Sequence, residues 1–246
     1  MDRMLYIGMS GAKETLLAQS LNNHNLANVS TTGFRADLAQ ARSMPVFGPG
    51  LPSRAYALTE RPGIDFTPGP IQTTGRDLDV AIRGQGFIAV QAPDGSEAYT
   101  RAGDLSVSPE GLLVTGTGLP VLGEGGPIAV PPAQSISIGV DGAITVVPLG
   151  QAANTQAVVD RIKLVNPPLA ELEKGEDGLL RGPGGRTYPA DAAVTLVSGA
   201  LEGSNVSPAQ ALVRMIELSR QFELQVKAMK TAEENDQRTA QLMRLS

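Results

Sequence analysis

The sequence predicts an α+β protein in which a long helix at each end flanks a central domain of mainly antiparallel β structure. Two observations carry this prediction: the positions of glycine and proline, and heptad spacing at both ends. Of 28 glycines, three lie before residue 45 and one after residue 200; of 18 prolines, all but Pro208 lie between residues 45 and 189. Both residues break helices and favour turns, so a turn-rich body separates two helical arms.

The N-terminal arm is predicted as a helix from about Asp2 to Asn28. Its residues at alternating steps of four and three form a heptad row interrupted by polar side chains: Leu5, Met9, Ala12, Leu16, Gln19, Asn23 and Leu26. Asparagine, serine and threonine side chains, which compete with the helical backbone, then lead to Gly33, where the chain can turn. The helix is therefore expected to end near Asn28.

The C-terminal arm opens with a strong helix start. Ser207 can cap, Pro208 suits the first helical position, and Gln210 completes a capping box. A second heptad row follows, with no glycine or proline to the end of the chain: Leu212, Met215, Ser219, Phe222, Val226 and Met229. A helix of about 37 residues would be roughly 55 Å long, which is typical of coiled coils and assemblies.

Two arrangements of these arms are consistent with the periodicity. The two helices can pair within one chain, or they can pack between subunits. Three features favour assembly between subunits. The heptad rows carry little charge, the C-terminal helix is long, and the polar residues that interrupt the rows can set the register. We therefore expect the arms to form coiled coils.

The body is predicted as β structure because short apolar runs lie between turn signals such as Asp141-Gly142. No helical pattern alternates with these runs, so a parallel α/β sheet is disfavoured. The runs are Leu78–Arg83, Gly86–Gln91, Leu112–Thr115, Ser135–Val140, Ala143–Val147 and Arg161–Val165. The predicted division is an N-terminal arm and loop (1–44), an extended proline-rich connector (45–75), the β-rich domain (76–200) and the C-terminal arm (201–246).

The composition excludes several kinds of bond and site. The chain has no cysteine and one histidine, so disulfides, cysteine nucleophiles and Cys/His zinc sites are excluded. A net charge of −5 and a pI near 5.0 argue against a nucleic-acid or anionic-lipid partner. The N-terminus lacks a signal-peptide h-region and no stretch of about 18 apolar residues occurs, so we expect neither a cleaved signal nor a membrane span.

Three local patterns were weighed as sites. The run Arg83–Ala89, with Gly84 and Gly86, resembles a dinucleotide fingerprint, but apparent strand follows where a helix is needed, so a tight turn is favoured. Asp77 and Asp79 could act as paired carboxylates in a hydrolase or bind calcium, although solvated or turn-stabilising aspartates are the simpler interpretation. His24 suits a helix end through its dipole. We therefore predict no catalytic residue, cofactor site, metal site or small-molecule substrate.

Motifs at both ends resemble the bacterial flagellar rod and hook protein family. The first lies in Asn25–Arg35 and comprises Asn25, Leu26, Ala27, Asn28, Thr31, Gly33 and Phe34. The second comprises Leu201, Glu202, Ser204, Asn205 and Val206. Between them, Leu78–Ile82 with Gly84, Gly86 and Phe87, and Tyr99–Arg101 with Gly103, resemble the β body of the family. Within the family, Met1–Tyr6 and Phe47–Arg54 most resemble proximal rod members, with distal rod members as the alternative.

The resemblance implies a non-enzymatic structural subunit of the axial rod, which crosses the periplasm and transmits torque. Its partners would be further copies, other rod proteins and the flagellar type III export apparatus, and it would be exported without signal cleavage. The terminal segments of family members form helices that pack as a coiled-coil tube on assembly. We therefore expect an inter-subunit seam made of Leu5, Met9, Leu16, Leu26, Leu212, Met215, Phe222, Val226 and Met229. A secreted carboxylate-dependent hydrolase using Asp77 and Asp79 is the enzymatic alternative.

Overall fold

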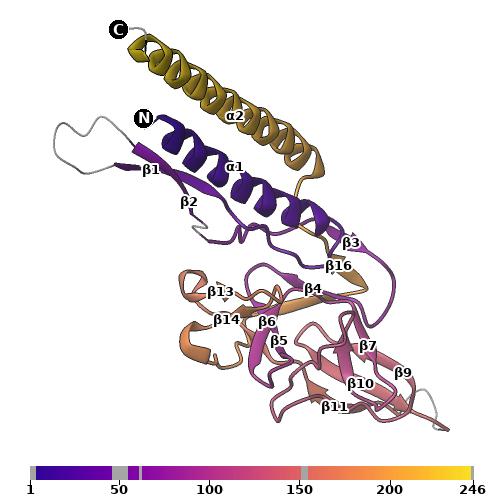
Figure 1. Cartoon of the computed structure of the whole chain (residues 1–246). Helices are drawn as coiled ribbons and strands as arrows, with labels where there is room; N and C mark the ends of the chain where they lie inside the picture. Colours follow the sequence, from indigo (N-terminus) through magenta and orange to yellow (C-terminus); the bar gives the residue numbers. More distant parts are fainter. Residues whose placement is uncertain (1–3, 46–54, 61–62, 151–154, 245–246) are drawn as a thin grey trace. The chain divides into compact units, whose positions relative to one another are not determined.

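A computed structural model describes residues 4–45, 55–60, 63–150 and 155–244 of the chain (Figure 1). The chain divides into two compact units, each built from segments far apart in the sequence. The helical unit comprises Met1–Asn28, Ala36–Asp65 and Val206–Ser246, and the β unit comprises Val29–Arg35 and Phe66–Asn205. The two short motifs at the ends of the predicted arms therefore contribute residues to both units.

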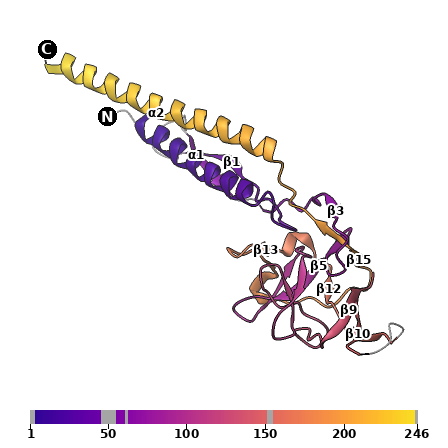
Figure 2. The same ribbon diagram turned by 90° about the vertical axis from the view of Figure 1, so that its right-hand side faces the viewer.

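Two helices dominate the helical unit: α1 (Met4–Ala27) and α2 (Pro208–Arg244). Their bounds agree closely with the predicted arms, and α2 begins at the predicted cap, where Ser207 Oγ accepts a hydrogen bond of 3.5 Å from Gln210 N. The two helices lie side by side and antiparallel (Figure 2). Within the described residues, no helix is both long enough and apolar enough to cross a membrane.

Small side chains let α1 approach α2 closely. A Cβ added to Gly8 would lie 2.7 Å from Cγ of Met229, and one added to Gly11 would lie 2.9 Å from Cδ of Gln225. Toward the other end, Asn22 Nδ2 donates to Ala211 O at 2.9 Å. A glycine inside a helix costs about 0.5–1 kcal/mol relative to alanine, so these two glycines are explained by the close packing that they permit.

The face of α1 that packs on α2 is adjacent to the predicted heptad row. Buried or partly buried residues of α1 follow the two rows Gly8, Thr15, Asn22 and Gly11, Ala18, Asn25. On α2 the corresponding rows are Ala211, Leu218, Gln225, Ala232 and Met215, Phe222, Met229. The heptad period is thus present on both helices, and the pairing within the chain uses the smaller side chains of α1.

A hairpin completes the helical unit. Strand β1 (Gln40–Pro45) pairs antiparallel with β2 (Ala55–Glu60), and β2 lies against α1. The sequence predicted extended chain from residue 45 onward but not this pairing, because few apolar residues alternate in the segment. Residues 46–54, which include the whole motif Phe47–Arg54, lie outside the described residues, as do residues 1–3. The four-segment division predicted from sequence stays a prediction.

The β unit contains fourteen short strands among its described residues. They are β3 (Ile71–Thr73), β4 (Val80–Arg83), β5 (Phe87–Gln91), β6 (Glu97–Thr100), β7 (Leu105–Val107), β8 (Leu113–Thr115), β9 (Ala133–Ile138), β10 (Ala143–Pro148), β11 (Ala157–Arg161), β12 (Leu164–Val165), β13 (Glu173–Lys174), β14 (Leu180–Arg181), β15 (Thr195–Ser198) and β16 (Ala200–Glu202). Single 3-10 turns lie at Leu169–Glu171 and Pro183–Gly185.

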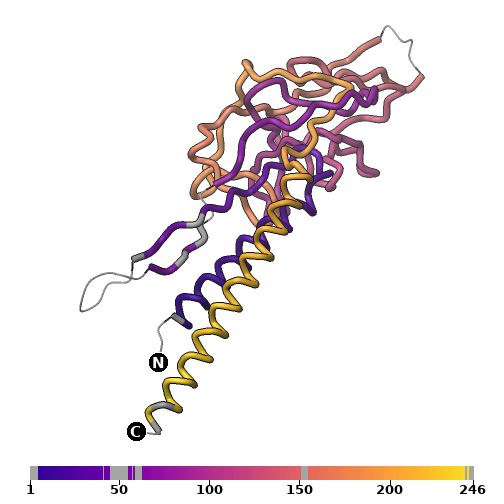
Figure 3. The backbone as a smooth tube through the Cα atoms, turned by 90° about the horizontal axis from the view of Figure 1, so that it is seen from above, coloured from indigo at the N-terminus to yellow at the C-terminus, as the bar shows by residue number. Residues whose placement is uncertain are grey.

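All strand pairings are antiparallel, as the sequence predicted. A five-stranded sheet has the order β12-β5-β6-β14-β13 and a three-stranded sheet the order β11-β10-β9, and the pairs β15-β4, β16-β3 and β7-β8 complete the unit (Figure 3 traces the chain). The sheets share one apolar core, in which Ile88, Leu105, Leu113, Ile128 and Ile144 are fully buried.

One predicted strand is wrong. Arg161–Val165 was expected as a single strand, but β11 ends at Arg161 and β12 begins at Leu164 in a different sheet. Ile162 N donates to Gly142 O and Lys163 N donates to Leu122 O, so the chain changes partners here. A short apolar run does not reveal where it leaves one sheet for another.

The glycine-rich run between β4 and β5 is a turn, which confirms the prediction. Gly84 has φ of +86° and Gly86 of +125°, and β5 continues from Phe87 as strand. No helix N-terminus follows these glycines, so the run lacks the feature that binds a pyrophosphate.

Candidate functional site

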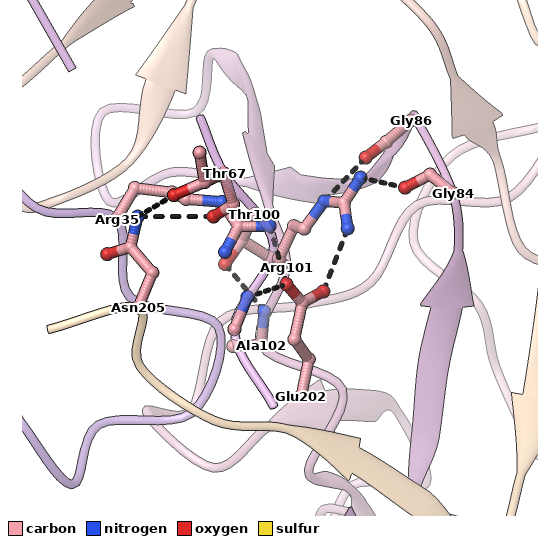
Figure 4. Close-up of polar contacts among 10 residues, drawn as sticks. Arg35, Thr67, Gly84, Gly86, Thr100, Arg101, Ala102, Glu202 and Asn205 are labelled. Carbon is pink, nitrogen blue, oxygen red and sulfur yellow. Dashed lines mark hydrogen bonds and ion pairs between the residues drawn. The ribbon is translucent and has the colours of Figure 1, made fainter. Parts of the chain in front are cut away.

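Within the β unit, the two end motifs meet. Gly33 N donates to Glu202 O at 2.8 Å, and Asn205 N donates to Phe34 O at 3.3 Å. Asn205 Nδ2 also donates to Thr67 O at 3.1 Å, which joins the segment that follows residue 65 (Figure 4). Each of these segments adjoins a point where the chain passes between the two units. The motifs therefore tie together the ends of the β unit.

A buried carboxylate holds this junction. Glu202 is 1% exposed and lies between two guanidinium groups: Oε1 is 2.6 Å from Arg35 Nη2, and Oε2 is 2.8 Å from Arg101 Nη1. Gly69 N donates to the same Oε1 at 2.9 Å. We call Arg35, Arg101 and Glu202 the junction cluster (Figure 4). Removing one partner of such a buried pair costs about 3–5 kcal/mol, because a charge is left without compensation.

Arg101 extends the junction cluster into the sheet. Its Nε donates to Gly86 O at 3.0 Å and its Nη2 donates to Gly84 O at 2.5 Å. Its guanidinium carbon also lies 5.4 Å from the centroid of the Phe87 ring. The glycine turn between β4 and β5 thus supplies two carbonyl oxygens that hold the guanidinium of Arg101 in place.

The loop of the first motif needs a glycine at position 33. Gly33 has φ of +67°, and an added Cβ would overlap the backbone of Arg101. Lys174 secures the next two residues, because its Nζ lies 4.0 Å from the centroid of the Phe34 ring and donates to Arg35 O at 2.7 Å. The loop is therefore held by close backbone packing, a cation–π contact and a buried ion pair.

The asparagines that end α1 bond to the main chain. Asn25 Nδ2 donates to Asp37 O and Asn25 Oδ1 accepts from Asp37 N, both at 2.9 Å. Asn28 Nδ2 donates to His24 O at 3.0 Å, and His24 Nδ1 lies 3.4 Å from Asp37 Oδ2. Asn25 thus joins the last turn of α1 to Asp37, and Asn28 bonds back to the helix end at His24.

The other motif residues vary in burial. Phe34, Glu202 and Ser204 are buried, Leu26, Asn28, Gly33, Leu201, Asn205 and Val206 are partly buried, and Ala27 and Thr31 are exposed. Arg101, the second partner of Glu202, was not predicted as a site residue. Its sequence signals are its place in the family-like run Tyr99–Arg101 and a charge directly after β6, and neither identifies a partner about a hundred residues away.

The nine residues of the predicted seam fall into two sets. Leu5, Met9, Leu16, Leu212 and Val226 are between 37% and 53% exposed. Leu26, Met215, Phe222 and Met229 are partly buried. The same helices carry further exposed apolar residues outside the predicted seam, namely Tyr6, Leu17, Val213, Ile216 and Leu224. These lie one or two positions from the predicted rows, so a wider stripe would have included them.

The candidate carboxylate pair does not form. Asp77 is exposed in a turn, whereas Asp79 is 4% exposed and bridges antiparallel to Asp104. Asp77 is therefore solvated, as the simpler interpretation expected, whereas Asp79 is buried just before β4 begins at Val80. Among the residues that the structure describes, no three acidic or histidine side chains are placed to hold a metal.

Two family models match the chain. Residues 197–242 match the C-terminal region of the flagellar basal-body rod proteins FlgE, FlgF and FlgG, and residues 81–146 match the D1 domain of the flagellar hook proteins FlgE, FlgF and FlgG. The first match includes Glu202 of the junction cluster and most of α2. The second spans β4 to β10.

Full-length relatives agree with these matches. The chain is 43% identical to the flagellar basal-body rod protein FlgF of Salmonella typhimurium and 44% identical to that of Escherichia coli, in both cases over the whole of both chains. It is 32% identical to the rod protein FlgG of Bacillus subtilis, over 99% of this chain and all of the relative. The chain therefore belongs to the flagellar basal-body rod and hook protein family and is FlgF-like.

Proposed function

We propose that this chain is a structural subunit of the flagellar basal-body rod and that its terminal helices pack in coiled coils against neighbouring subunits. The observation that carries this proposal is the exposed apolar surface of α1 and α2. Met9 is 53% exposed, Leu16 50%, Leu212 50% and Ile216 55%, although both helices are already paired along their other faces. A secreted hydrolase using Asp77 and Asp79 lacks support.

The energetics favour further packing of these faces. Burying one large apolar side chain contributes about 1.5–3 kcal/mol. Contiguous exposed apolar surface on a helix is typical of a protein-binding face. A head-to-tail contact of this kind can repeat without closing, which produces a helical tube. The partners would be further copies of this chain and other rod proteins.

The remaining parts of the proposal follow from the FlgF-like character of the chain. The chain would lie in the proximal part of the rod, within the periplasm, and would transmit torque. It would pass through the flagellar type III export apparatus without loss of a signal peptide. A long amphipathic helix is marginal alone and gains its stability from packing, so folding of the arms would be coupled to assembly.

The assembly seam is tested with one pair of variants in cells whose own copy of this chain is replaced. Val226→Asp places a charge on the exposed apolar face of α2, while Gln221→Asp adds the same charge at an exposed polar position of the same helix. Hook–basal bodies are purified and the chain is quantified by mass spectrometry. We expect Val226→Asp to reduce incorporation at least tenfold and Gln221→Asp to leave it unchanged.

The outcomes separate the rod assignment from the seam. Wild-type chain missing from intact hook–basal bodies would contradict the rod function. Wild-type chain present together with normal incorporation of Val226→Asp would contradict only the seam. A fixed small copy number, compared with the copy number of the FlgG-type rod protein in the same particles, tests the proximal position.

A further inference from the structure

Two aspartates of the β unit lie opposite each other. Asp79, just before β4, and Asp104, just before β7, form an isolated antiparallel bridge. Residues paired in this way carry their side chains on the same side of the ladder, with Cβ atoms about 4.5–5.5 Å apart. The Asp79 side chain is only 5% exposed. Two like charges are thus placed directly opposite each other, one on the buried Asp79 and one on the partly buried Asp104.

The surroundings offer one cation to this pair. Arg76 Nη1 lies 3.4 Å from Asp79 Oδ1, and Arg76 Nη2 donates to the carbonyl of Leu105. On the other side, Asp104 packs against the main chain at Gly116, which donates a backbone hydrogen bond to it. Arg76 is therefore the charged group that faces the pair, and it compensates one carboxylate.

Two oxygens of the pair make no hydrogen bond. Within the described part of the chain, Asp79 Oδ1 and Asp104 Oδ1 are shielded from solvent and accept no hydrogen bond, and the ion pair of Asp79 Oδ1 with Arg76 is long, at 3.4 Å. A shielded carboxylate oxygen that accepts no hydrogen bond is costly, and two adjacent carboxylates cannot both stay ionised cheaply. A single proton removes this conflict, because the resulting O–H of Asp104 can donate to Asp79 while Asp79 keeps its ion pair with Arg76.

We propose that Asp79 and Asp104 form a carboxyl pair that binds one proton and stabilises the β unit as the pH falls. The electrostatics support this assignment, since burial first, and then the negative charge of Asp79, raise the pKa of Asp104 above its ordinary value. A carboxyl whose pKa is higher in the folded state binds its proton more tightly there. Its contribution to stability is complete below the unfolded pKa and is lost as the pH rises through the folded pKa.

Carboxyl-carbon NMR of the full chain, labelled at aspartate Cγ, tests the pair directly. We expect one aspartate signal to titrate above the range of the exposed aspartates, and Asp104→Asn to remove that signal. Asp77→Asn is the matched control, because it changes the same group at an exposed position and should remove an ordinary signal. An Asp104 signal that titrates in the ordinary range would overturn the proposal; if Asp104→Asn does not fold, the wild-type signal is assigned through its backbone.

Urea unfolding at two pH values tests the consequence for stability. At pH 7.5 we expect Asp104→Asn to unfold at a higher urea concentration than the wild type, because the repulsion is gone. At pH 5 this difference should shrink, whereas the difference between Asp77→Asn and the wild type should stay constant. An equal effect of Asp104→Asn at both pH values would contradict proton binding by the pair.

Discussion

The helical unit and the β unit use their apolar residues in opposite ways. In the β unit, Ile88, Leu105 and Ile144 are fully buried in a shared core. In the helical unit, Val213 is 57% exposed and Leu224 67%, although their helix is already paired with α1. The β unit thus encloses a core of its own, with exposed apolar residues such as Val140 and Val158 outside it, whereas the two helices pair along one face and leave large apolar side chains exposed on the others.

Charges show the same contrast. The β unit buries Glu202 between Arg35 and Arg101, whereas an ion pair of α2, Arg214 with Glu217, is more than half exposed at both partners. Exposed pairs contribute about 0–1 kcal/mol, and loss of one partner from a buried pair costs several times more. The β unit also has exposed pairs, such as Arg161 with Asp141, so the two units differ in the buried carboxylate of Glu202 and not in their surface ion pairs.

The largest effect is expected when the junction cluster is broken. Glu202→Ala leaves two buried guanidinium groups without their carboxylate, so the free energy of unfolding of the β unit should fall by about 3–5 kcal/mol. Urea unfolding followed by the near-UV signal of the tyrosines measures this loss. Glu110→Ala, at an exposed turn, is the control and should leave the free energy of unfolding nearly unchanged. Equal stability of both variants would contradict the role given to Glu202.

Two residues of α2 sharpen the distinction between inner and outer faces. Leu218 is 3% exposed and Ile216 is 55% exposed, only two positions away. Leu218→Ala should lower the stability of the helical unit by about 2–5 kcal/mol because it leaves a cavity. Ile216→Ala should change it by less than about 0.5 kcal/mol and weaken assembly instead. Thermal unfolding followed by circular dichroism at the helix band compares the two; similar losses would mean that the exposed face is not free.

The first motif offers a matched test of close packing. Gly33→Ala and Gly75→Ala both place a side chain at positive φ, but only the Cβ at position 33 would overlap another backbone. Strain at positive φ costs about 1–3 kcal/mol at either position. Gly33→Ala should therefore destabilise the β unit clearly more than Gly75→Ala in urea unfolding. Equal losses of stability in the two variants would show that position 33 requires glycine for its positive φ alone and not for close packing on Arg101.

The smallest effect concerns an exposed pair with the opposite pH dependence to Asp104. The hydrogen bonds from Arg181 lower the pKa of Asp177 below its ordinary value. The pair contributes stability above the unfolded pKa and loses it as the pH falls through the folded pKa. Asp177 is one-third exposed, so Asp177→Asn should cost only about 0.2–1 kcal/mol at pH 7. Unfolding midpoints at pH 7 and pH 3 measure this, and a loss that persists unchanged at pH 3 would contradict it.

The sequence by itself determined the elements whose signals are local. The cap at Ser207, the heptad rows of both arms and the glycine turn at Gly84 predicted α1, α2 and the link from β4 to β5 because spacing and backbone preference act over a few residues. The resemblance in the two end motifs identified the family, which the full-length relatives confirm.

Only the tertiary structure decided which of these elements meet. Several faces of α1 have a heptad period, and the small residues Gly8 and Gly11 select the one that packs on α2. Glu202 meets Arg101 and Asp79 meets Asp104 across sequence separations that no local pattern records. Side-chain spacing encodes the shape of one segment, whereas partners distant along the chain are chosen by the simultaneous packing of all segments.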